Sequence, residues 1–126
     1  MAQTFRDLIA WQKSIELVTM VYQATETFPR TEIYGLTNQL RRAAVSIPSN
    51  IAEGQSRHSH PEFHHFLRNA RGSLGELETQ LIIARNLGFL AAKAADALFE
   101  RSAELGRILN ALLSAIEKQK RGGRPD

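Results

Sequence analysis

In four long segments of this chain, apolar residues recur at alternating steps of three and four, the spacing of one face of an α-helix. We predict helices over about 7–27, 35–53, 60–86 and 92–119, and no β-strand. Four long helices joined by short loops favour an all-α, antiparallel, up-down-up-down four-helix bundle. We therefore predict one bundle domain over residues 1–119, followed by a disordered basic tail over 120–126.

Each predicted helix presents one apolar stripe for the core. On the first helix the stripe is Leu8, Trp11, Ile15, Val18, Tyr22 and Thr25. On the second it is Leu36, Leu40, Ala43, Ile47 and Ile51. On the third it is Phe63, Leu67, Ala70, Leu74, Leu77, Leu81 and Ala84. On the fourth it is Ala95, Leu98, Ser102, Leu105, Leu109, Leu112 and Ile116.

Pro48 lies inside the second predicted helix. A proline cannot donate to the carbonyl four residues back, here that of Ala44, and its ring clashes there. We therefore predict that this helix is kinked at Pro48, or divided into two shorter helices in series. Ser46 and Ser49 are candidates to bond the carbonyls that the proline leaves free.

The chain has 126 residues, a formal net charge of +3 and no cysteine. This length fits one domain, and the lack of cysteine excludes disulfides and thiolate metal ligands. No apolar run approaches the ~18 residues that span a bilayer, and the first residues form no apolar signal core. We expect a cytoplasmic protein with no membrane partner. The slight excess of basic residues weakly favours an anionic binding partner.

Small and apolar residues also lie on faces that point away from the predicted core. Gly72 and Gly75 do so on the third helix, and Val45, Pro48 and Ala52 on the second. A glycine in an exposed helix costs roughly 1 kcal/mol relative to alanine, which close approach of another backbone would offset. We predict a homo-oligomer interface at these residues. Glycines that merely loosen a helix, and scattered exposed apolar residues, are the alternatives.

The region between residues 41 and 71 is rich in arginine and poor in acids. Its arginines are Arg41, Arg42, Arg57, Arg68 and Arg71, and its only acids are Glu53 and Glu62. Arginine suits phosphate because its planar donors bind bidentately. We predict RNA or DNA binding at these arginines, directed at the backbone and sensitive to salt. The alternative is that they form salt bridges between subunits, for example to Glu76 or Glu78.

The sequence does not indicate an enzyme, a cofactor or a metal site. Its histidines are clustered as His58, His60, His64 and His65. Glu62 and His65 have the Glu-x-x-His spacing of di-iron bundles, but such a site needs two of these motifs. No serine has a histidine and an acid arranged as a nucleophile needs, and phosphate-loop and dinucleotide motifs are absent. We predict no catalytic residue, and the role of the histidines stays open.

Several segments carry a family resemblance: 7–13, 28–29, 32–36, 39–54, 62–63, 66–67 and 70–80. Residues 39–54 read QLRRAAVSIPSNIAEG and residues 70–80 read ARGSLGELETQ. Over nearly the whole chain, these segments closely resemble bacterial four-helix bundle proteins of the 23S ribosomal RNA intervening-sequence family. Ser56, where a glycine is more usual, and the histidine-rich stretch 58–65 look less typical.

The resemblance implies a bundle that assembles into a ring-shaped homopentamer of largely unassigned function. A related branch is the accessory protein of diversity-generating retroelements, which binds nucleic acid and a reverse transcriptase through basic surfaces. The family motif falls on Arg41, Arg42, Ser46, Pro48, Asn50, Glu53, Gly54, Arg71, Gly72, Ser73 and Glu76. No catalytic role attaches to any of them.

Two functions therefore compete. The first is sequence-independent nucleic-acid binding by an oligomer, with a reverse transcriptase partner implied by family analogy only. The second is a homo-oligomeric protein-interaction scaffold that does not bind nucleic acid and whose arginines serve the assembly.

Overall fold

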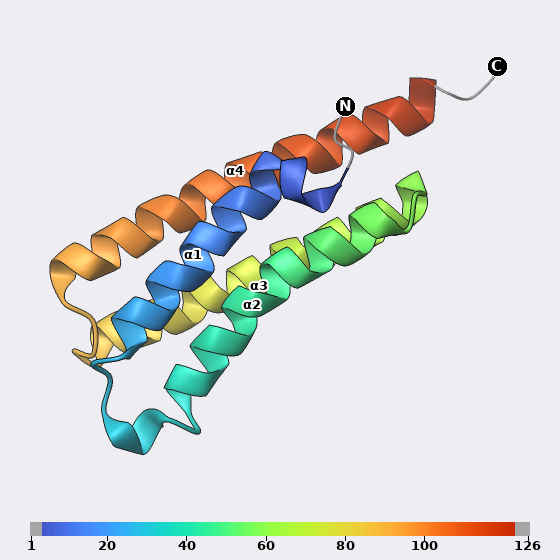
Figure 1. The fold of residues 1–126 in the computed structure, drawn as a ribbon. Helices are drawn as coiled ribbons and strands as arrows, with labels where there is room; N and C mark the ends of the chain where they lie inside the picture. The colour runs from blue at the N-terminus through green and yellow to red at the C-terminus, as the bar shows by residue number, and fades with distance from the viewer. Residues whose placement is uncertain (1–3, 123–126) are drawn as a thin grey trace.

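The computed structural model describes residues 4–122, with side chains through residue 119. Over this range the chain forms four long helices, α1 (Ile9–Thr25), α2 (Leu36–Ser56), α3 (His60–Asn86) and α4 (Ala92–Gly122). Two short 3₁₀ helices, η1 (Phe5–Asp7) and η2 (Arg30–Glu32), precede α1 and α2. The helices run up, down, up and down, so that the predicted all-α antiparallel bundle is confirmed (Figure 1).

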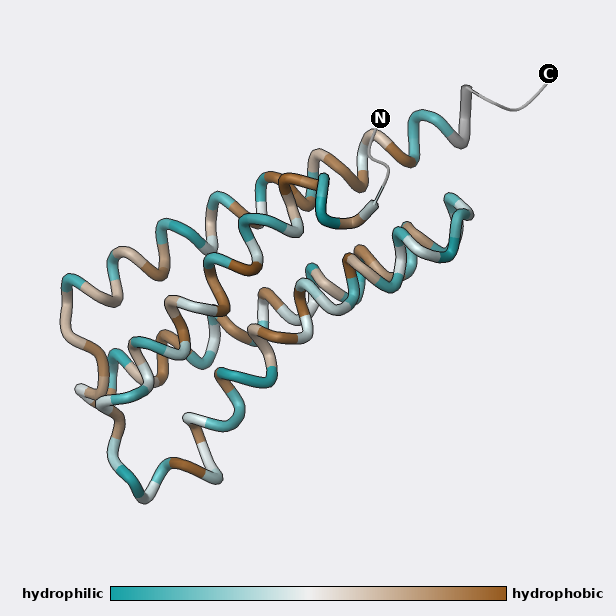
Figure 2. Tube along the Cα trace, in the orientation of Figure 1, coloured by the Kyte–Doolittle hydropathy of each residue, from teal (hydrophilic) through white to brown (hydrophobic). Residues whose placement is uncertain are grey.

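The core lies where the apolar faces of the four helices meet, and Figure 2 shows these faces as brown turns between teal ones. The predicted inward stripes of α2, α3 and α4 are confirmed. Nearly all their residues are buried, with only Phe63 and Leu112 half-buried at the edge. None of the helices within residues 4–122 is both long and apolar enough to cross a membrane.

The predicted stripe of α1 is right for Thr25, but the rest of the fully buried face lies one residue earlier than predicted. The buried residues are Ala10, Ser14, Leu17, Val21 and Thr25. Leu17 is 1% exposed, whereas Ile15 and Tyr22 of the predicted stripe are 39% and 41% exposed. The apolar arc of α1 is wider than one stripe, because Leu8, Trp11 and Val18 also pack against the core while half-buried.

α2 is a single helix despite Pro48. Its ribbon changes direction near the middle without breaking, which fits the predicted kink and not two helices in series (Figure 1). The Ser49 hydroxyl donates to the carbonyl of Val45 at 2.9 Å, and the Asn50 amide donates to that of Ser46 at 2.8 Å. Side chains around the proline thus bond helix carbonyls, although not the Ala44 carbonyl that Pro48 leaves free.

α2 and α3 approach closely at the turn that joins them. Gly54 is buried, and a Cβ built on it would lie 2.8 Å from Phe66 Cβ and 3.0 Å from Phe63 Cδ1. Only a residue without a side chain fits this contact. α2 continues through Gly54 and ends at Ser56, whereas the sequence predicted its end near Glu53.

The other boundaries follow local signals. Thr4 and Asp7 form a capping box, but it caps η1 and α1 starts afterwards at Ile9. Ser59 caps α3 by accepting from the Glu62 amide at 3.3 Å. α4 continues through Gly122, three residues into the predicted tail, and residues 123–126 of that tail lie outside the described part.

Candidate functional site

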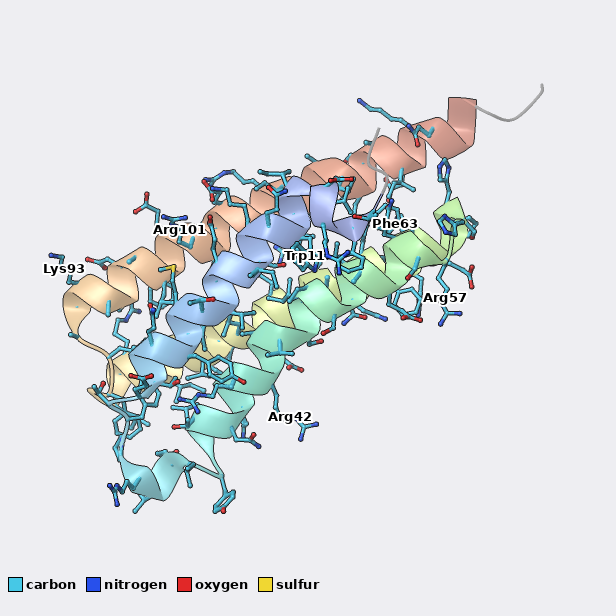
Figure 3. All side chains as sticks on the ribbon, in the orientation of Figure 1. Trp11, Arg42, Arg57, Phe63, Lys93 and Arg101 are labelled. Carbon is cyan, nitrogen blue, oxygen red and sulfur yellow. The ribbon has the colours of Figure 1, made fainter. Side chains whose placement is uncertain are left out.

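A groove follows the seam between α1 and α2, and we call it the α1–α2 groove. Its apolar half is lined by Trp11, Ile15, Val18, Val45, Pro48, Ser49 and Ala52. Ile15 and Val45 are 39% and 40% exposed there, so that apolar side chains from two helices face solvent together. In Figure 3, Trp11 lies between the ribbons of α1 and α2. The residues that were wrongly assigned to the core of α1 form one wall of this half.

A second pocket adjoins the apolar half at Val45, which lines both, and we call it the cationic half of the α1–α2 groove. This half is lined by Tyr22, Ile33, Thr37, Asn38, Arg41, Arg42, Val45 and Ser46. Two of these residues are arginines and none is an acid. The groove thus changes along its length from an apolar surface to a polar, positively charged one.

Arg41 is held in place by α1. Its Nε donates to Thr25 Oγ1 at 2.9 Å, its Nη2 donates to the Tyr22 carbonyl at 3.5 Å, and its guanidinium carbon lies 4.6 Å from the centre of the Tyr22 ring. The Thr25 hydroxyl in turn donates to the Val21 carbonyl at 2.8 Å. Arg41 therefore links α2 to α1, and sequence reasoning missed this role because Thr25 was assigned to the core alone.

The other predicted arginines differ in their surroundings. Arg57 pairs with Glu53 and lies over the Phe66 ring, while Arg71 Nε donates to Asn110 Oδ1 on α4 at 3.2 Å. Arg42 and Arg68 are exposed, and none of the described hydrogen bonds or ion pairs involves either. Figure 3 shows Arg42 extending away from the bundle and Arg57 at the α2–α3 end.

Within the single chain, the structure does not bring all the predicted arginines together. Arg41 and Arg42 lie at the α1–α2 groove, Arg57 lies at the α2–α3 turn, and Arg71 lies against α4. Arg41, Arg57 and Arg71 also make contacts within their own chain.

The five predicted interface residues lie on two surfaces. Val45, Pro48 and Ala52 line the apolar half of the α1–α2 groove, where Pro48 is buried and the other two are accessible. Gly72 and Gly75 lie on α3, and a Cβ on either would have no neighbour within 4 Å. Both glycines therefore face open space in the isolated subunit.

Polar side chains join α2 to α3 beside these surfaces. The hydroxyls of Ser46 and Ser73 are 2.8 Å apart, and the Asn50 amide donates to Ser46 Oγ at 3.0 Å. Ser73 was not among the predicted site residues, although the family motif includes it. This cluster positions the two helices, since each side chain has a partner within the bundle.

The histidines form no metal centre. His64 Nε2 lies 2.9 Å from Glu117 Oε1 on α4, and His65 contacts the Asn69 amide at 3.5 Å. His58 adopts a positive φ of 56° at the turn between α2 and α3. Within residues 4–119, no three metal-ligating side chains come together, so no described residues can be assigned to a metal.

Comparisons with known proteins place this architecture in a family. A model of the 23S rRNA-intervening sequence protein family matches residues 6–111. The chain belongs to this family. The match includes the α1–α2 groove, the α2–α3 turn and all five predicted arginines.

One similar solved structure is a protein of unknown function from the S23 ribosomal protein family of Bacteroides thetaiotaomicron. It superposes with a TM-score of 0.75 at 19% sequence identity, and the match covers 83% of this chain and 98% of that one. This likeness shows a shared fold. A search of curated proteins finds no match.

Proposed function

We propose that this 23S rRNA-intervening sequence protein is a non-catalytic scaffold that functions as an assembly of identical copies. The observation that carries this proposal is the open apolar half of the α1–α2 groove. Its exposed Ile15 and Val45 face solvent beside Trp11 and Val18, both of which are only half-buried. A contiguous apolar surface with contributions from two helices is typical of a protein interaction site.

A second copy fits the groove because the chain carries a different surface to place there. The α3 surface around Gly72 and Gly75 is open, and its glycines allow another backbone to approach closely. A contact between two different surfaces is heterologous, and it closes into a ring when the rotation between copies permits. The ring of five that the resemblance implies is one such closure.

Size-exclusion chromatography with light scattering tests this proposal. We expect the unmodified protein to elute as a closed oligomer, a pentamer in the form we propose. Val45→Glu places a charge in the apolar half and should dissociate the assembly into smaller species. The matched control is Ile9→Glu, because Ile9 is 54% exposed on α1 and does not line the groove.

The control should leave the oligomer intact while circular dichroism confirms that both variants are helical. A monomeric unmodified protein would contradict the proposal. An assembly that survives Val45→Glu would contradict the assignment of the groove.

A second candidate function is binding to the backbone of RNA or DNA. The observation in its favour is that Arg42 and Arg68 are exposed and take part in none of the described ion pairs. No acid lies between Glu32 and Glu53 in the sequence, so the start and middle of α2 carry only positive charge. In a closed oligomer these charges repeat around the axis, which strengthens the attraction for phosphates.

The test is fluorescence anisotropy with a structured RNA at two salt concentrations. Charge reversal of Arg42 and Arg68 together should abolish binding at low salt and leave the oligomer unchanged. Binding that is insensitive to both changes would contradict this candidate. A reverse transcriptase partner stays a prediction from the resemblance alone.

A further inference from the structure

We propose that the cationic half of the α1–α2 groove is a binding pocket for a phosphate group. This half is an open hollow of about 520 Å³, and its lining combines two arginines with hydroxyl and amide side chains and no acid. The proposal concerns a defined pocket on each subunit. It borders the proposed assembly surface at Val45, which lines both halves, and it differs from general attraction to a nucleic-acid backbone.

Arg41 supplies a guanidinium whose position is already fixed. The described contacts use two of its five N–H donors, one toward Thr25 and one toward the Tyr22 carbonyl. Its other donors have no described partner, and Arg41 is among the residues that line the pocket. Because the Tyr22 ring and Thr25 hold the guanidinium, little conformational entropy remains to be lost when an anion binds.

Arg42 supplies a second charge, and it also borders a neighbouring pocket between α2 and α3 that contains Glu76. It lines the same pocket as Arg41, is exposed and takes part in none of the described ion pairs. Asn38 lies one helical turn before Arg42 on the same face of α2 and adds an amide donor.

No acidic side chain lines the pocket beside Arg41 and Arg42, and the acid nearest to them in the sequence is Glu32. Glu32 is absent from the lining, and its Oε1 accepts from the Leu36 amide at 3.1 Å. Exposed Tyr22 and Ile33 border the arginines, and they offer an apolar surface beside the phosphate position. The phosphate can therefore belong to a small phosphorylated molecule or to a single-stranded nucleic acid, whose bases stack on such surfaces.

The first experiment titrates the full-length protein with inorganic phosphate by calorimetry at constant ionic strength, with chloride as the reference anion. We expect saturable binding that Arg42→Gln weakens about tenfold, the loss expected for one charge-assisted contact. Arg68→Gln is the matched control, because it removes the same charge from an exposed arginine outside the pocket. It should leave phosphate affinity unchanged.

The second experiment identifies the source of the phosphate. A nucleoside monophosphate and a labelled single-stranded 12-mer are titrated separately, and inorganic phosphate is then added as competitor. Displacement of the 12-mer by phosphate would assign the pocket to a phosphodiester chain. Tight binding of the monophosphate without binding of the 12-mer would assign it to a small molecule.

Two outcomes would overturn the pocket: no saturable phosphate binding, or equal losses of phosphate affinity from Arg42→Gln and Arg68→Gln. Equal losses for the 12-mer would support general backbone binding in place of the pocket. The phosphate pocket and general nucleic-acid backbone binding can therefore be contradicted separately. Asn38→Ala provides a second pocket variant that leaves the net charge unchanged, and it should also weaken phosphate binding.

Discussion

Arg41 and Arg42 are adjacent in the sequence and both line the cationic half of the α1–α2 groove, yet only Arg41 has described partners on α1. Arg41 points toward α1, where Thr25 and Tyr22 engage its guanidinium, whereas Arg42 extends into solvent. Successive residues of a helix lie about 100° apart, which is enough to separate a structural arginine from a free one. The sequence predicted both as nucleic-acid ligands because it shows charge and spacing but no partner.

At the scale of single residues, Gly54 gives a direct prediction. Gly54→Ala should lower the free energy of unfolding by about 1–3 kcal/mol, the usual cost of overpacking a core. The reason is the 2.8 Å separation between the added Cβ and Phe66 Cβ. Urea denaturation followed by circular dichroism measures the change.

Gly106→Ala is the control for this prediction. A Cβ at buried Gly106 would have Leu74 Cδ2 at 3.6 Å as its only neighbour within 4 Å, an ordinary contact. Alanine is also favoured over glycine in a helix by about 1 kcal/mol, so this variant should be as stable as the original or more so. Equal destabilisation by both substitutions would contradict the close packing of α2 on α3.

At the scale of elements, sequence periodicity predicted all four helices and the core faces of three. It failed on most of α1, where the buried face includes Ser14, whose hydroxyl donates to the Trp11 carbonyl at 2.7 Å. A serine that bonds its own helix can be buried at little cost. With Ser14 counted as a core residue, the correct face of α1 becomes visible in the sequence.

Pro48 gives a prediction for α2 as a whole. Pro48→Ala removes a ring clash and restores a donor, which favours the helix by about 3 kcal/mol. It also removes buried ring carbons, which costs about 1.6 kcal/mol. We expect the free energy of unfolding to rise by about 1 kcal/mol, as measured by urea denaturation.

The same substitution should weaken self-association, because the Pro48 ring lines the apolar half of the α1–α2 groove. Light scattering on the same samples measures this effect. A variant that is both less stable and fully assembled would contradict the assignment of Pro48 to the groove.

At the scale of the whole molecule, the two sides of the bundle are held together differently. α2 and α3 are joined by the Gly54 contact and the Ser46–Ser73 hydrogen bond. Between α1 and α4, Lys13 pairs with Glu104 at 3.6 Å and Arg101 with Glu16 at 3.1 Å, and all four side chains are partly or largely exposed. Exposed ion pairs of this kind contribute little to stability.

Hydrogen exchange followed by mass spectrometry should therefore show an uneven bundle. Amides in residues 43–54 and 66–81 should exchange slowest, and those of α1 and α4 should open first, because local stability follows packing. Uniform protection of all four helices would indicate that α1 and α4 unfold only together with the α2–α3 hairpin.

The candidate surfaces were less predictable than the fold. Sequence reasoning named Val45, Pro48, Ala52, Gly72 and Gly75 as one interface, and the structure divides them between the α1–α2 groove and α3. Helical spacing predicts which residues share one face of one helix, but not how faces of two helices combine. That combination depends on the rotation of each helix about its axis, which packing sets.

The position of Trp11 has a practical consequence. It is the only tryptophan of the chain, it is half-buried in the apolar half of the groove, and its ring centre lies 5.3 Å from that of Phe5. If a second copy covers the apolar half of the groove, the Trp11 indole is shielded from solvent, and its fluorescence emission shifts to shorter wavelength. Dilution of the unlabelled protein in a fluorimeter would then follow the association equilibrium through an intrinsic optical probe.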